Sequence, residues 1–562
     1  GAVALGGGGT TGVALSGAGV YAENRINTST TATIDGLATT ARTLRAASLI
    51  VTATDNSAIR VRALGASLAG SAGGTAGVAV SIGLALAFNS LDLVTSATVR
   101  SAAVTTTTGS VLVSATTAPP TGAILVLSAL GADPASALDN AATATPNDPT
   151  TSADESATDA VADAVRAAAL TAAVSAATGW TPQTGASRVV TTVRPGEVWQ
   201  LTVGQDTFLV TKIVGPAGTS YAVARPSIDA LAIAASVAAT FGGTAGIAFS
   251  GAGAYARNDV RGATRALVES STIGSATSVT VSAASVATIS AVIVGASVAI
   301  GGGSTTGIGV SIGIAIADNH IGGTRGAPAE GPGPLTVSAQ VLRSSVTAPA
   351  SLAVTATAQQ QIVAMVIAAS AAIAAGGVVG VGASGAGAAS MNTIVSDVTA
   401  SIDGNGLAAG PPVINAGSTT VTALDRSTIR TLTLGASIAA AFAGTAAVAL
   451  SIGVSVALNT IDTAVTSRLA DVSVTGGAGR AVQVTADRSA VIDSLAVAAS
   501  LAASASGVVA GSIAGAGAAA TNVILTRTTA TIANASVGSV STPMGSVTVT
   551  ATDASAIRAI IV

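Results

Sequence analysis

The sequence has no cysteine, a single lysine (Lys212) and a single histidine (His320), and only 2% of its 562 residues are aromatic. Without cysteine, neither disulfides nor thiolate metal sites can form. One histidine without a partner histidine or cysteine leaves no material for a metal site or a Ser/His/Asp triad. We therefore expect no enzyme activity, no catalytic residue, no cofactor and no metal.

Charge is also scarce, with 9% charged residues and a formal net charge of −3. A chain with one lysine has no basic surface for nucleic acid, so that class of partner is excluded. Hydrophobic residues make up 49% of the chain, and 65 residues are glycine. Such a composition is typical of membrane or fibrous proteins.

The clearest pattern in the chain runs from Gly77 to Asn89. Large apolar residues such as Ile82 and Leu84 stand at every second position, and Ala, Gly or Ser stand between them. A period of two predicts a β-strand with one bulky face and one small face. Copies of this run indicate a repeat protein. The copies end at Asn24, Asn89, Asn258, Asn319, Asn392, Asn459 and Asn522.

Two serines recur at constant distance before most of these Asn residues, as Ser67 and Ser81 do before Asn89, whereas Ala514 replaces the second serine before Asn522. The runs that hold them flank a Gly-rich centre, which predicts a β-hairpin with the two serines roughly opposite each other. We interpret the recurring Asn and Ser as stacked ladders that satisfy one another's amides and hydroxyls. The first serines are Ser67, Ser236, Ser297, Ser370, Ser437 and Ser500, and the second are Ser16, Ser81, Ser250, Ser311, Ser384 and Ser451.

The predicted fold is therefore an all-β, solenoid-like array of long β-hairpins with a period of about 65 residues. The repeats alternate between two kinds: the second serine begins Ser-Ile-Gly in one kind and Ser-Gly-Ala-Gly in the other. Gly251 and Gly253 would leave room for Ile312 and Ile314 of the opposite kind, so the structural period spans two units. Gly1 and Val562 fall inside repeats, and we expect the chain to be a segment of a longer one.

The pattern stops in the middle of the chain, which divides it into a repeat array (1–116), an inserted α+β side domain (117–227) and the continued array (228–562). Ser152-Ala-Asp-Glu155 is a capping-box pattern and predicts an Ala-rich helix to Gly179. Segments 198–203 and 207–213 predict a small hairpin.

A membrane helical hairpin is the main structural alternative, because Ile362–Ser396 and Leu495–Thr526 contain no charged residue. The period of two and the recurring glycines oppose it, and a strand buried on both faces also lacks charge. Membrane embedding is therefore disfavoured. Asp55, Asp425 and Asp553 recur in the more polar strand of the repeat; we interpret them as solvated carboxylates, with calcium ligands as the alternative.

The segment Val51-Thr-Ala-Thr-Asp-Asn-Ser-Ala-Ile-Arg60, followed by Gly73-Gly-Thr-Ala-Gly-Val-Ala-Val-Ser81 and Asn89, resembles repeats of very large bacterial filamentous adhesins. The nearest are the leukotoxin-type filamentous adhesins of Gram-negative bacteria. The resemblance implies a secreted, fibrous, β-rich protein at the cell surface.

From this resemblance and the repeats, we expect a structural component of an extracellular bacterial fibre or surface filament. An adhesin that binds a surface ligand through its insert and loops is the first alternative, and a membrane-inserting toxin segment is the second. We also expect self-association into fibres, and we expect the flat small face to pack closely against a similar face. That second face belongs either to a neighbouring unit of the same chain or to another chain, and the sequence does not decide between the two. The flat small face is formed by Ala230, Ala232, Ala234, Ser236, Ala248, Ser250, Ala252 and Ala254.

Overall fold

The computed structural model describes residues 1–36, 42–119, 124–125, 198–203, 206–215, 218–224, 226–325, 333–404 and 410–562. All regular structure in these residues is β-strand, which confirms the all-β prediction. The described chain forms two compact units, one of residues 1–55, 59–117 and 230–562 and one of residues 56–58 and 118–229. The helix predicted from Ser152 to Gly179 lies outside the described residues.

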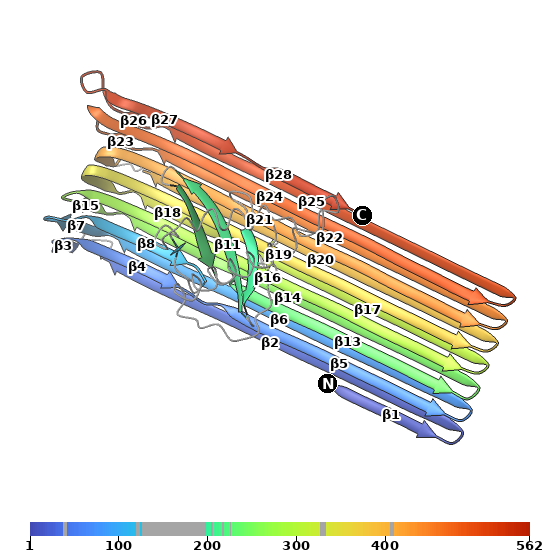
Figure 1. The fold of residues 1–562 in the computed structure, drawn as a ribbon. Coiled ribbons are helices and arrows are strands. Elements are labelled where there is room, and N and C mark those ends of the chain that lie inside the picture. Colours follow the sequence, from blue (N-terminus) through green and yellow to red (C-terminus); the bar gives the residue numbers. More distant parts are fainter. Residues whose placement is uncertain are drawn as a thin grey trace. The chain divides into compact units, whose positions relative to one another are not determined.

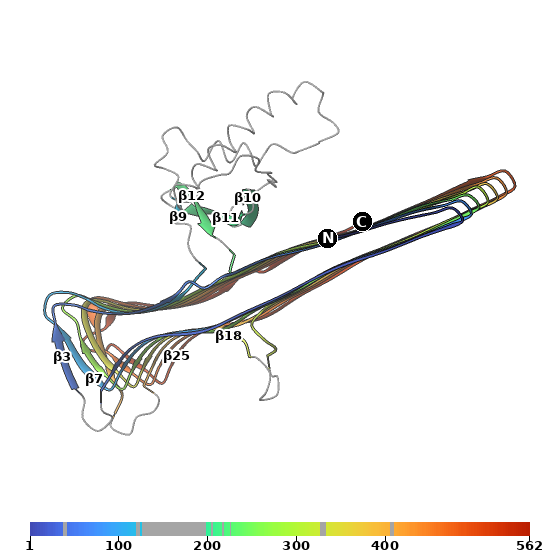
Figure 2. The same ribbon diagram turned by 90° about the horizontal axis from the view of Figure 1, so that it is seen from below.

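The first unit consists of two parallel β-sheets stacked face to face (Figures 1 and 2), as expected for a β-solenoid-like fold. Sheet A has 16 strands and sheet B has eight. The long strands of sheet A are β1 (Ala2–Gly8), β5 (Ile59–Gly73), β13 (Ile228–Gly242), β16 (Ser278–Gly303), β19 (Ser345–Gly376), β21 (Val413–Ala443) and β24 (Gly477–Ser506). Its shorter strands are β3 (Arg42–Ala46), β4 (Leu49–Asp55), β7 (Ala102–Thr106), β8 (Val111–Thr117), β15 (Thr272–Gly274), β23 (Ser473–Val474), β26 (Ser536–Val537), β27 (Met544–Asp553) and β28 (Ala556–Ile561). Sheet B contains β2 (Thr11–Asp35), β6 (Ala76–Arg100), β14 (Ala245–Glu269), β17 (Thr306–Ile321), β18 (Leu335–Leu342), β20 (Val379–Asp403), β22 (Ala446–Ala470) and β25 (Val509–Ala533).

The predicted β-hairpins are wrong, because the two strands around each Gly-rich centre belong to different sheets. β5 pairs with β1 and β13 in sheet A, whereas β6 pairs with β2 and β14 in sheet B. We call one repeat of the stack a coil. The turn between the two strands of a coil forms hydrogen bonds with the turns of neighbouring coils: Gly74 N–H donates to the Gly8 carbonyl, and Gly243 N–H donates to the Gly73 carbonyl. Each repeat is therefore an arch whose strands meet face to face. Their backbone hydrogen bonds run along the stack.

Successive strands are in parallel register, so that equivalent residues lie side by side. Gly77 lies beside Gly12 and Gly246, and Ser81 lies beside Ser16 and Ser250. A shift of one residue would exchange the two faces of a strand, which explains the constant spacing of the repeats. Directly after five strands of sheet B, namely β6, β14, β18, β22 and β25, stands a residue other than glycine with a positive φ angle, which is unusual for such residues. These residues are Ser101, Ser270, Arg343, Asp471 and Asn534.

The small faces of the two sheets form the core between them, and the bulky faces point outward. Ala230, Ala232 and Ala234 are fully buried, as is Ala248 on the opposite strand. The expected contact between small faces therefore lies within one chain, between its own sheets. Small side chains let the two backbones approach: a Cβ added at Gly65 would stand 2.2 Å from the Leu84 carbonyl oxygen.

A second part of the core lies near the short strands β7, β15, β23 and β26, at the end of each repeat away from the Gly-rich turn (Figure 1). It is richer in Val and Ile, because here the chain surrounds a wider space than the thin Ala/Ser layer between the long strands. Val104, Ile273, Val354 and Ile414 are among its buried residues.

One row of sheet A is interrupted by the second unit. β8 pairs with β16 opposite Val279–Ser285, and β13 pairs with β16 as well. Residues 118–227 therefore separate two strands that share one neighbour. In the second unit β10 (Val198–Val203), β11 (Asp206–Gly215), β12 (Gly218–Ala224) and β9 (Ile124–Leu125) form an antiparallel sheet in that order.

The two charge-free runs considered for a membrane helical hairpin are strands, namely β19 with β20 and β24 with β25. Within the described residues, no helix has the length and apolar character needed to cross a membrane.

Candidate functional site

The recurring asparagines form a single chain of side-chain hydrogen bonds along sheet B. In each step the Nδ2 group of one Asn donates to the Oδ1 atom of the next, at 2.7 to 2.9 Å. The central members Asn258 and Asn319 are fully buried. Because every amide points the same way, each bond polarises the next and the low-dielectric interior strengthens all of them. The ladder runs through Asn24, Asn89, Asn258, Asn319, Asn392, Asn459 and Asn522.

The hydroxyls of the recurring serines pair across the core, between the two sheets, and do not form the predicted ladder along one sheet. The Ser236 and Ser250 hydroxyls are 2.8 Å apart, and Ser236 also donates to the Ser81 carbonyl oxygen. Hydroxyl pairs of this kind join the two sheets at one level and satisfy polar groups buried in the Ala-rich layer. The pairs are Ser67–Ser81, Ser236–Ser250, Ser297–Ser311, Ser370–Ser384 and Ser437–Ser451. In the last unit Ser500 lies beside Ser437 in sheet A, and Ala514 takes the place of the second serine.

The interpretation of the recurring aspartates as solvated is wrong for Asp55 and Asp425, which are both buried. The alternation of the strand places them on the inner face. Burial raises the pKa of Asp425 to about 6, although the hydrogen bond from Ser427 and the charge of Arg488 oppose that shift. Arg488 is itself fully buried, with Nε 3.8 Å from Asp425 and Nη1 2.9 Å from Asp553. This group joins three neighbouring coils of sheet A.

His320 lies on the outer face of β17, where its Nε2 atom is 2.7 Å from the Asp318 carboxylate. Burial raises the pKa of the Asp318 carboxyl, but the interactions with His320, Arg257 and Tyr255 together lower it further, so the net shift of this pKa is downward. In the part of the chain that the structure describes, no group of three or more His, Cys, Asp or Glu side chains is placed to hold a metal ion.

The sequence did not predict that the large apolar residues of sheet B form an exposed outer face. Ile82, Ile312 and Ile452 are each about half exposed, at 50%, 51% and 48%. The period of two showed that these residues share a face with one another. It could not show that this face is the outer one, because both faces are apolar.

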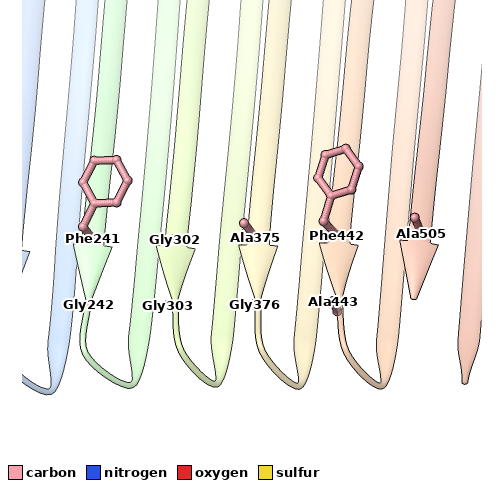
Figure 3. A pocket seen from close by; sticks show the side chains of 9 residues that line it. All are labelled: Phe241, Gly242, Gly302, Gly303, Ala375, Gly376, Phe442, Ala443 and Ala505. Atoms are coloured by element: carbon pink, nitrogen blue, oxygen red, sulfur yellow. The ribbon is translucent and has the colours of Figure 1, made fainter. Parts of the chain in front are cut away.

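Sheet A also exposes apolar side chains, and near the turns they border an open trough of about 580 Å³ (Figure 3). Phe241 and Phe442 stand at its two sides, and Gly302 and Ala375 lie between them. The residues that line this trough are Phe, Gly and Ala, so it offers a ligand only apolar contacts.

The stacked parallel sheets and the buried ladders define the first unit as a β-solenoid-like structure whose repeated polar side chains bond to one another. Comparison with known proteins identifies no relative: no protein-family model, no curated protein and no solved structure matches the chain.

Proposed function

We propose that this protein is a structural component of an extracellular bacterial fibre or surface filament, with no enzyme activity. The observation that carries the proposal is the uninterrupted register of the Asn ladder through β2, β6, β14, β17, β20, β22 and β25. The finer architecture belongs to the same proposal: repeats of about 65 residues, alternating in two kinds, with residues 117–227 as an insert.

The mechanical logic follows from the direction of the bonds. Backbone hydrogen bonds and the amide ladder both run along the stacking axis, so each coil is joined to the next over its whole length. A repeat array of this kind contacts only nearest neighbours, and its stability is a sum of coil and interface terms. A rod built this way becomes longer without a change in its cross-section, as a filament requires.

Electron microscopy of the purified 562-residue chain, with X-ray diffraction from aligned material, tests the proposal. We expect rods or fibres of uniform width and a reflection at about 4.7–4.8 Å along the fibre axis, since the strands lie across it. Dispersed particles that never elongate, at any protein concentration, would contradict the structural role. Particles found only on membranes would favour the toxin alternative.

An adhesin is the second candidate, because the second unit carries its own four-stranded sheet and separates two strands of one row. A domain inserted at that point adds a surface to a rod without a break in its stacking. Binding to bacterial or host cells that is lost when residues 120–226 are removed, while rods still form, would favour this function.

A further inference from the structure

The outer face of sheet B carries alternating ridges and grooves. At two adjacent levels, successive strands present a pair of large side chains and then a pair of glycines, in strict turn. The ridges are Ile82 with Leu84, Ile312 with Ile314, and Ile452 with Val454; the grooves are Gly17 with Gly19, Gly251 with Gly253, Gly385 with Gly387, and Gly515 with Gly517.

The fold of the chain does not require the glycines in the grooves. A Cβ added at Gly385 or Gly387 meets nothing within 4 Å, whereas one added at the inward Gly435 would stand 2.1 Å from the Val454 carbonyl oxygen. Glycine within a strand is unfavourable by about 0.5–1 kcal/mol relative to Ala. A glycine there often marks the close approach of another molecule. The inward glycine is explained by the second sheet. Among the eight outward glycines, a Cβ meets nothing within 4 Å at seven, and at Gly253 it would stand 3.0 Å from the flexible end of Leu84, so packing within the chain does not explain the pairs.

We infer that this face binds the same face of a second copy of the chain, with the ridges of one copy in the grooves of the other. Ridges recur every second strand, at about 9.6 Å, and grooves recur at the same spacing. A copy rotated by a two-fold axis parallel to the strands, and offset by one strand, brings each ridge over a groove. The pairing is self-complementary, as an isologous interface requires.

The area and the charge of the face agree with this partner. Over residues 76–87 and the equivalent residues of the other six strands there is no charged side chain. That band measures about 40 Å by 30 Å. With an offset of one strand the two faces overlap over about 40 Å by 25 Å, so pairing would bury roughly 2,000 Å² in total, above the usual size of about 1,600 Å². Fluid acyl chains adapt to any relief and would not need strict alternation, whereas a second rigid sheet would.

The inference rests on the proposed structural role, because it describes how two rods associate side by side. The test is the double variant Gly385→Val with Gly387→Val in the full chain, measured by sedimentation and by fibre width in micrographs. Valine favours strands, and its Cβ meets nothing within 4 Å at either position, so we expect the thermal midpoint to stay or rise. Lateral association weakens by at least about tenfold, because the groove is filled.

The matched control is Ala369→Val with Ala371→Val on the outer face of sheet A, which adds similar apolar surface and leaves association unchanged. The variant Ile312→Ala with Ile314→Ala removes a ridge and weakens association from the other side, so the test does not depend on one variant folding. Unchanged or stronger association of the groove variant overturns the inference. So does flotation of the unmodified chain and the groove variant alike with phosphatidylcholine vesicles. If the unmodified chain forms no rods, the structural role fails. If rods form with unaltered width in both variants, only the pairing fails.

Discussion

Replacement of Asn319 by Ala interrupts the amide ladder at its centre, and the structure sets the size of the effect. Asn319 is fully buried, accepts a hydrogen bond from Asn258 at 2.7 Å and donates one to Asn392 at 2.8 Å. The substitution orphans one donor and one acceptor in the core. At about 1–3 kcal/mol for each unsatisfied group, we expect a loss of roughly 2–6 kcal/mol.

The matched control is Asn522→Ala at the last rung, where only the bond from Asn459 is lost and the site is part-buried. Its expected cost is about 1–3 kcal/mol or less. Urea unfolding measures the totals, and hydrogen exchange of β17 and β20 localises the loss, since repeat arrays can open in parts. If Asn319→Ala costs no more than Asn522→Ala, the ladder does not stabilise the stack and this reasoning is refuted.

Three further predictions follow from the same geometry. Ala299 is fully buried between the sheets, so Ala299→Leu should lower the free energy of unfolding by about 1–3 kcal/mol or more, measured by thermal unfolding. The control Val298→Leu, at the outward neighbour, should change the stability little. Equal losses of stability in the two variants would mean that the layer between the sheets has room for a larger side chain. The pKa of Asp425 is about 6 in the folded chain and 3.8 ordinarily, so the free energy of unfolding should be highest below about pH 4 and fall as pH rises through 6, by up to about 3 kcal/mol. Asp425→Asn should remove that part of the pH dependence of stability. An unchanged dependence would contradict the raised pKa of Asp425. Removal of residues 120–226 leaves Ala118, Pro119 and Ser227 between β8 and β13, as many residues as Asn56–Ala58 between β4 and β5, so the register is kept. This variant should keep a β-rich circular dichroism spectrum and cooperative unfolding, because both flanking strands pair with β16. Loss of the β signal would show that the insert is needed for folding.

The strands and the residues that become neighbours in the stack follow from the sequence alone. The period of two from Val78 to Phe88 permits no helix, because a helical period would scatter its large side chains around the axis. The constant spacing of Asn and Ser specifies which residues lie side by side, since one slipped position would exchange the faces. Composition alone, with one histidine and no cysteine, already limits the chemistry that the chain can perform.

The choice of the inner face, in contrast, depends on the tertiary structure. Both faces of a strand such as β6 are apolar. The Ala/Ser face is the buried one because two backbones approach each other closely there, and the local sequence pattern does not predict that approach. The same holds for the arch at Gly74: a turn between two strands is compatible with pairing to each other or to neighbouring coils, and the hydrogen-bond partners are chosen by the whole stack. The burial of Asp425 beside Arg488 likewise depends on residues from three coils, so its shifted pKa follows from tertiary packing alone.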